Sequence, residues 1–151
     1  MINDKSGYAV VAAAIRALSK LDFDASKTLI ENAARTSTNT QIRRQALNEL
    51  LGHNDPVGVD AMFDSLGEMQ ADNVQVAGMN ALQNYKGGND PRIVPALHNA
   101  LTSGNFNMIF PALTIAQTRK VKEVIPDLQA LKAQFSFFGQ QIDEAIAAIN
   151  K

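Results

Sequence analysis

A nine-residue motif recurs five times along the chain and constrains the fold more than any other feature of the sequence. In each copy an apolar or branched residue is followed four positions later by a small residue. A mostly apolar pair comes three and four positions after that, and only the last copy opens on a polar residue, Gln141. The small residues are separated by 32, 32, 34 and 33 positions, and they are Ala14, Ala46, Gly78, Ala112 and Ala145. A fixed period in this range is typical of stacked-repeat proteins, in which each unit buries its apolar face against its neighbours.

The segments between the motif copies also have helical periodicity. Their apolar residues are spaced by three and four, as in Ile93, Leu97 and Leu101, and no stretch alternates as a strand would. Asp55-Pro56 and Asp90-Pro91 are typical helix starts, because the carboxylate caps free N–H groups and the proline has none to lose. The sequence predicts nine helices, at residues 7–20, 24–35, 40–52, 57–69, 73–85, 91–103, 107–118, 122–134 and 138–150.

Composition excludes several classes of function. The net charge of −1 gives no overall field that would hold nucleic acid or an anionic membrane. The chain has no cysteine, which removes disulfides, thiolate metal sites and thiol catalysis. No apolar run approaches the length that crosses a bilayer and the start is polar, so we expect a soluble chain without a signal peptide and leave its compartment open.

The motif resembles the HEAT repeat, most closely at residues 42–50, Ile-Arg-Arg-Gln-Ala-Leu-Asn-Glu-Leu. The resemblance covers nearly the whole chain, and the expected fold class is all-α: a right-handed alpha-alpha superhelix (HEAT-like solenoid) of about nine helices, as four hairpins plus one half repeat. We expect one domain over residues 1–151, with repeat units at about 6–37, 38–70, 71–104, 105–135 and 136–151. The family's arginine after the first motif position is present only as Arg43, so its usual Asp–Arg ladder is not expected here.

The opening of the chain carries a finer resemblance. Residues 6–18, Ser-Gly-Tyr-Ala-Val-Val-Ala-Ala-Ala-Ile-Arg-Ala-Leu, and the following Ser-Lys-Leu-Asp are similar to the start of the C-terminal HEAT-like region of bacterial aminopeptidase-N-type zinc metallopeptidases. That resemblance implies a catalytic domain upstream, on which the helical domain packs and whose chamber it partly closes. Zinc would then belong to the parent protein, because this chain has no H-E-x-x-H motif and none of the family's catalytic residues can be assigned in it.

The first predicted helix is apolar on all sides between Tyr8 and Ile15, a pattern that suits burial on two faces. Its first face would pack on the following repeats. We therefore expect the chain to be part of a longer protein, with an exposed apolar patch or a contact around Val11 and Ile15. The partner would be an upstream domain of the same polypeptide or another protein.

Few residues suggest chemistry. His53 and His98 lie in different repeats, 45 positions apart, and are expected to be ordinary turn or surface histidines. Asp60, Asp64 and Glu68 are spaced by four on one predicted helix. They form a dock for a basic partner, a weak cation site or a solvated outer face, and we favour the solvated face. No catalytic, cofactor-binding or metal-ligating residue is predicted.

Two further clusters have structural explanations that we favour. Arg119, Lys120 and Lys122 are expected to complement a helix dipole, not to bind nucleic acid. Phe135, Phe137 and Phe138 are expected to fill the junction between the last two helices.

Three functions follow from these observations. The first is a non-catalytic C-terminal solenoid of a zinc aminopeptidase. The second is a free-standing HEAT-type scaffold that binds a protein in its concave face through Arg16, Asn48, Asn80 and Thr114. The third and least favoured is a HEAT-like chromophore lyase, which would need a reactive site that the sequence does not reveal.

Overall fold

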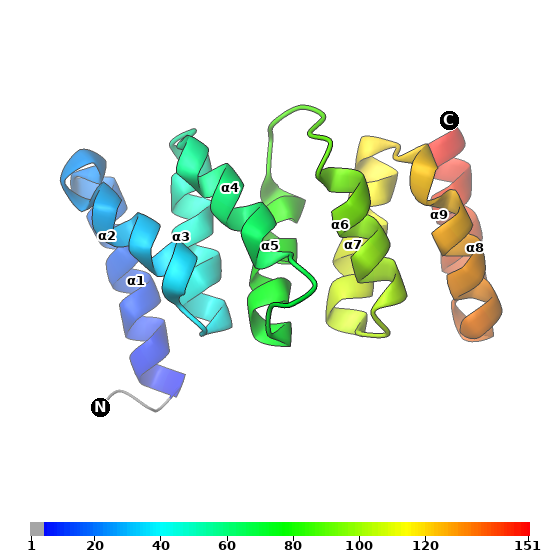
Figure 1. Ribbon diagram of the computed structural model, residues 1–151, viewed down its shortest axis with the longest axis horizontal. Coiled ribbons are helices and arrows are strands. Elements are labelled where there is room, and N and C mark those ends of the chain that lie inside the picture. The colour runs from blue at the N-terminus through cyan, green and yellow to red at the C-terminus, as the bar shows by residue number, and fades with distance from the viewer. Residues whose placement is uncertain (1–4) are drawn as a thin grey trace. The chain divides into compact units, whose positions relative to one another are not determined.

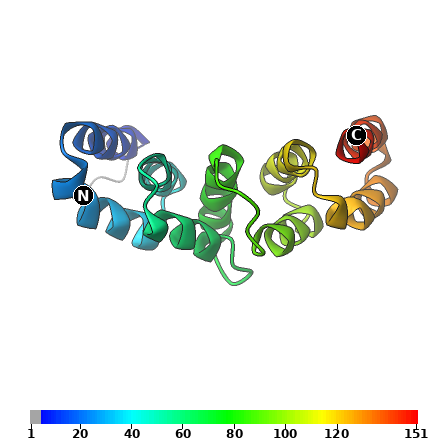
Figure 2. The ribbon, with the colours of Figure 1, turned by 90° about the horizontal axis from the view of Figure 1, so that it is seen from above.

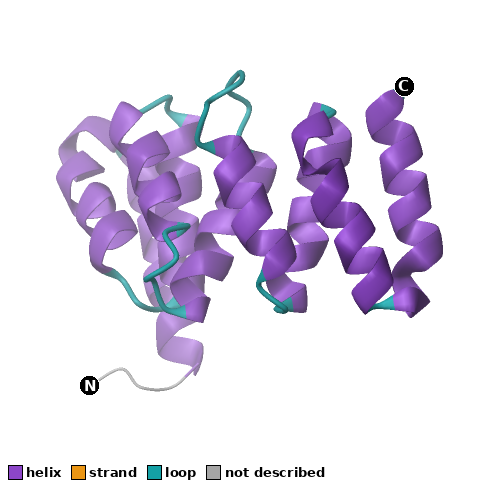
Figure 3. Ribbon diagram, turned by 45° about the vertical axis from the view of Figure 1, so that its right-hand side comes forward, coloured by secondary structure: helices purple, strands orange, loops and turns teal. Residues whose placement is uncertain are grey.

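The computed structural model describes residues 5–151, and over these residues the chain is entirely helix and loop (Figure 3). The all-α prediction is therefore confirmed. The α-helices are α1 (Lys5–Leu21), α2 (Phe23–Thr36), α3 (Thr40–Gly52), α4 (Pro56–Ser65), α5 (Asp72–Asn84), α6 (Ile93–Thr102), α7 (Phe106–Arg119), α8 (Ile125–Gln134) and α9 (Gly139–Asn150). Short 3-10 turns, η1 (Lys122–Val124) and η2 (Ser136–Phe138), precede the last two helices. The helices fall into two compact units, residues 1–85 and residues 86–151, each described here by itself.

The first unit contains two layers of helices. Helix α3 lies between α1 and α5, and α2 and α4 pack against these three from one side (Figures 1 and 2). The motif-bearing helices α1, α3 and α5 thus share a layer, which is the order expected of stacked hairpins. Its core is made of side chains with no exposed surface: Ile30, Leu47, Leu50, Met62, Met79 and Leu82.

The second unit repeats this arrangement on a smaller scale. Helices α7 and α9 pack against each other, while α6 contacts α7 and α8 (Figure 1). Its innermost side chains come from all four helices and from η1, and they are Leu97, Ile109, Val124, Leu128, Ile142 and Ile149.

Side-chain caps fix several helix starts. Asp22, Asn39, Asp55 and Asn105 each accept hydrogen bonds from backbone N–H groups of the helix that follows, as the polar cap rule requires. The expected start at Asp55-Pro56 is confirmed. At Asp90-Pro91 the carboxylate instead accepts from Arg92 N in a turn, and α6 begins only at Ile93.

Helix α4 is shorter than predicted. It ends at Ser65 instead of continuing to residue 69, and Leu66 N and Gly67 N close turns on Phe63 O and Asp64 O. Glycine is a poor helix residue, which favours the end at this point. Glu68 therefore lies outside the helix, and the prediction of one acidic stripe along it is wrong: only Asp60 and Asp64 share α4.

The small residues of the motif mark close packing in four of five copies. Ala46, Ala112 and Ala145 have no exposed surface, and Gly78 is buried as well. A Cβ added to Gly78 would lie 2.9 Å from Ser65 Cβ, so a larger residue would push α5 away from α4. Ala14 of the first copy is exposed instead, because α1 packs through Ala12, Ile15 and Ser19.

Candidate protein-docking surface

Helix α1 carries an exposed apolar stripe along the side that faces away from its own unit. Val10, Leu18 and Leu21 are 66%, 39% and 83% exposed, and Ala14 lies between the first two. Positions 10, 14, 18 and 21 fall on one side of a helix with 3.6 residues per turn. We name this set the α1 stripe.

The stripe is uncovered because α1 packs on its own unit through its opposite side. Ala12, Ile15 and Ser19 are buried against the unit, and α1 contacts α2 and α3. The expected exposed apolar patch at this end is confirmed, but its residues differ from those predicted. Val11 is half-buried and Ile15 is buried, so the stripe, and not these two residues, forms the patch.

A groove of about 400 Å³ runs beside the stripe, between α1 and α3. Its floor is made of alanines of α1, and we name it the α1–α3 groove. Arg16 and Lys20 line it on the α1 side, one helical turn apart, and Gln41 and Gln45 line it on the α3 side. The complete lining is Ala9, Ala12, Ala13, Arg16, Ala17, Lys20, Gln41 and Gln45.

The charge of this groove is positive. Both cations are exposed, and neither forms an ion pair with another described residue. No carboxylate is among the lining residues. The side-chain amide of Gln45, which lines the groove, donates to Glu49 Oε1 at 2.6 Å. Glu49 follows Gln45 by one turn on α3.

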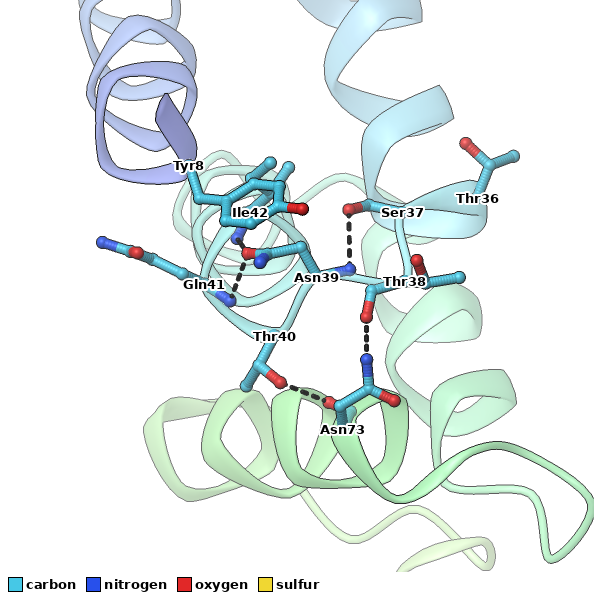
Figure 4. Close-up of a pocket in the computed structure, with 9 residues that line it drawn as sticks. All are labelled: Tyr8, Thr36, Ser37, Thr38, Asn39, Thr40, Gln41, Ile42 and Asn73. Carbon is cyan, nitrogen blue, oxygen red and sulfur yellow. Dashed lines mark hydrogen bonds between the residues drawn. The ribbon is translucent and has the colours of Figure 1, made fainter. Parts of the chain in front are cut away.

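A polar pocket of about 630 Å³ continues from the groove at the N-terminal end of α3, and Gln41 lines both (Figure 4). Tyr8 of α1 borders the pocket on one side and Asn73 of α5 on another. Asn39 Oδ1 accepts from Gln41 N and Ile42 N, and Thr40 Oγ1 donates to Asn73 O at 3.0 Å. Asn73 Nδ2 in turn donates to Thr38 O. Most of these polar groups are therefore committed to joining the α2–α3 loop to α5.

The buried Arg43 joins the same loop to α3 and α4. Its side chain donates from Nε to Ser65 Oγ and from Nη1 to Ser37 O, both at 2.9 Å. Burial lowers the pKa of Arg43, and the nearby Asp64 acts in the opposite direction. This residue holds three segments together and is not available to a partner.

The predicted concave-face residues occupy different environments. Arg16 lies in the groove, whereas Asn48 is half-buried and its Oδ1 atom is buried without a hydrogen-bond partner. Asn80 is half-buried on α5, and Thr114 is exposed on α7, where its hydroxyl donates to Phe110 O. Asp60, Asp64 and Glu68 are all exposed. A partner-binding role for these seven residues stays a prediction.

Each histidine makes a structural contact. His53 Nε2 lies 3.1 Å from the buried hydroxyl of Ser19, and its ring stacks on Phe23 with centroids 3.8 Å apart. His98 Nδ1 lies 2.9 Å from Asp127 Oδ1, joining α6 to α8. Within residues 5–151, no three His, Cys, Asp or Glu side chains gather in a way that could hold a metal ion.

The second unit contains the other two predicted clusters. Arg119 donates to Gly87 O and Gly88 O and so fixes the loop before α6, while Lys120 ends α7 in a left-handed conformation with φ 53°. Phe138 is buried as expected, but Phe137 is 70% exposed. Phe135, Phe137 and Phe138 therefore fill the junction between α8 and α9 only in part, and Phe138 also contacts Phe106 and Phe110 of α7.

Sequence reasoning missed three polar residues of the groove: Lys20, Gln41 and Gln45. A signal for Lys20 was present, because it follows Arg16 by four on a face that is otherwise alanine. The two glutamines had none, since their place in the groove depends on how α3 is rotated against α1.

No known protein family, no curated protein and no solved structure matches this chain in comparisons with each. The helices of residues 5–151 include none that is both long enough and apolar enough to cross a bilayer.

Proposed function

We propose that this chain is a non-catalytic helical-repeat domain that docks on another protein surface through the α1 stripe. The supporting observation is the exposure of Val10, Leu18 and Leu21 on a helix whose opposite side is already buried in its own unit. Fully burying a Val or Leu side chain contributes about 1.5–3 kcal/mol. Covering the stripe would therefore supply a substantial part of the energy of a stable interface.

In its most specific form, the proposal is a C-terminal HEAT-like solenoid of a zinc aminopeptidase. The right-handed superhelix comes from the resemblance of the recurring motif to the HEAT repeat. The catalytic domain as the docking surface and the zinc of the parent protein come from the resemblance of residues 6–22. The two-layer order of hairpins within each unit supports the solenoid part of this proposal. The chain itself would shape the substrate chamber and supply no catalytic group.

The alternative is a free-standing HEAT-type scaffold, which is favoured by a separate observation, the α1–α3 groove. The two candidates differ in what the gene encodes before residue 1. An in-frame H-E-x-x-H motif upstream supports the aminopeptidase, whereas a start codon at Met1 supports the scaffold.

The docking role itself is tested in the full-length product of the gene. Leu18→Asp with Leu21→Asp places two charges in the stripe, and we expect this domain to be released from its partner surface and cleaved sooner in limited proteolysis. Leu29→Asp with Met69→Asp is the matched control, because it adds the same two charges at residues that are 56% and 98% exposed and lie outside the stripe. Unchanged proteolysis of the double variant would refute docking through α1.

A further inference from the structure

We infer that the α1–α3 groove binds an acidic amphipathic helix of a partner protein. This inference goes beyond the proposed docking function, because it concerns a different surface from the α1 stripe. The groove joins an apolar floor to two cations and carries no acid among its lining residues.

The floor is suited to a helix because it is built of small side chains. Ala9, Ala13 and Ala17 are exposed and follow one another at intervals of four along α1. Methyl side chains leave room for a partner backbone to approach closely, whereas longer side chains would hold it away. Apolar residues of the partner would cover these methyl groups.

The two cations supply both the charge and the spacing. Arg16 and Lys20 are four residues apart, so their Cβ atoms lie about 5–6 Å from each other on the helix surface. Two carboxylates spaced by three or four on a partner helix have the same separation and match both cations at once. The guanidinium can also bind a carboxylate with two parallel hydrogen bonds.

One helix terminus beside the groove, the N-terminus of α3, has the same sign as the two cations, whereas Glu49, which accepts from Gln45, has the opposite sign. The N-terminus of α3 opens on the polar pocket next to Gln41 and has no acidic residue in its first turn, so its partial positive charge is not offset there. Lys20 lies in the last turn of α1, where its charge also offsets the partial negative charge of that helix end. The side chains that cross from α3 are the neutral Gln41 and Gln45, which can hydrogen-bond to either partner charge without repelling a carboxylate.

The probes are two fluorescein-labelled 16-residue peptides with one apolar Ala/Leu face. One carries glutamates spaced by four beside that face, and the other carries lysines at the same positions. We expect the glutamate peptide to bind, measured by fluorescence anisotropy, and its affinity to fall as salt is raised from low to physiological ionic strength. The lysine peptide is expected not to bind, because charge complementarity decides between otherwise equal partners.

Arg16→Glu with Lys20→Glu should weaken glutamate-peptide binding about tenfold or more at low salt. Lys122→Glu with Lys151→Glu is the matched control, because both lysines are exposed in the second unit and the net charge changes equally. Ala13→Tyr, which fills the floor at an exposed position, should also abolish binding, with an unchanged thermal melt. The α1 stripe is intact in all of these variants. If they bind the glutamate peptide as the parent does, groove binding is refuted and stripe docking is unaffected. If the stripe variants show no effect on docking, groove binding is likewise unaffected.

Three results would overturn the inference. One is equal binding of the two peptides, and another is equal weakening by the groove and control variants. The third is tighter binding of a short single-stranded RNA than of the glutamate peptide, with the same sensitivity to Arg16→Glu and Lys20→Glu, which would mean that the cations bind phosphates.

Discussion

Helices α1 and α3 carry the same motif 32 residues apart, but its residues have opposite environments. Val10, Ala14 and Leu18 of α1 are exposed, whereas Ala46 and Leu50, the counterparts of the last two, have no exposed surface. The difference follows from neighbours: α3 lies between α1 and α5, and α1 has α3 on one side only within the described unit. The motif thus specifies a helix with a face suited to burial, and the adjacent helix decides whether that face is buried.

The largest expected effect separates Leu50 from Leu18. Leu50→Ala leaves a cavity between α3 and its neighbours and should lower the free energy of unfolding by about 2–5 kcal/mol. Leu18→Ala removes a side chain that is 39% exposed and should cost less than about 1 kcal/mol. Urea unfolding followed by circular dichroism measures both. Equal losses would show that Leu18 is covered in solution, for example by a second copy of the chain.

The small residue of the motif gives the second comparison. Ala46→Leu should overpack the layer between α1 and α5 and cost about 1–3 kcal/mol, because Ala46 has no exposed surface. Ala14→Leu adds the same atoms at an exposed position and should change stability by less than about 0.5 kcal/mol. Thermal melts of the two variants would contradict the packing of α3 if Ala46→Leu unfolded at the temperature of the parent.

Positions 16 and 48 are also 32 residues apart, and here the substitution in α3 is expected to raise the free energy of unfolding instead of lowering it. Asn48 Oδ1 is buried without a partner, so Asn48→Leu removes an unsatisfied acceptor and should raise the free energy of unfolding by about 1 kcal/mol. Arg16→Leu, at the exposed counterpart, should change it by less than about 0.5 kcal/mol. A loss of stability in Asn48→Leu would instead mean that an ordered water satisfies the amide.

The sequence predicts each helix but not which neighbours that helix packs against, and this limits how much of the structure could be predicted. Periodicity predicted nine helices with bounds close to those observed, because the spacing of apolar residues reports on a helix directly. Periodicity could not predict contacts between distant positions, such as the contact of Ser19 with His53 or the place of Gln41 in the groove. These contacts depend on the rotation of each helix about its axis, which a sequence motif shared by five helices does not encode.

The layer formed by α2 and α4 offers the smallest effect. It is expected at Glu31 of α2, whose counterpart 32 residues later is the buried Phe63 of α4. Partial burial raises the pKa of Glu31, and so does the neighbouring Asp55 carboxylate, with Lys27 and Arg35 opposing. The Glu31 side chain is 20% exposed, and Asp55 Oδ2 is buried without a hydrogen-bond partner.

The folded state therefore binds the Glu31 proton more tightly than the unfolded state. Its contribution to stability is fully present below the unfolded pKa and is lost as pH rises through the folded pKa. Glu31→Gln should remove that slope, because the amide can donate to Asp55 at every pH, and at neutral pH the two proteins should differ by less than about 0.5 kcal/mol. Urea unfolding between pH 4 and 7 measures the slope, with the exposed Glu68→Gln as the control. If the pH dependence persists in Glu31→Gln, it belongs to another carboxyl group. Glu31 of α2 and Phe63 of α4 would then differ only in how they pack.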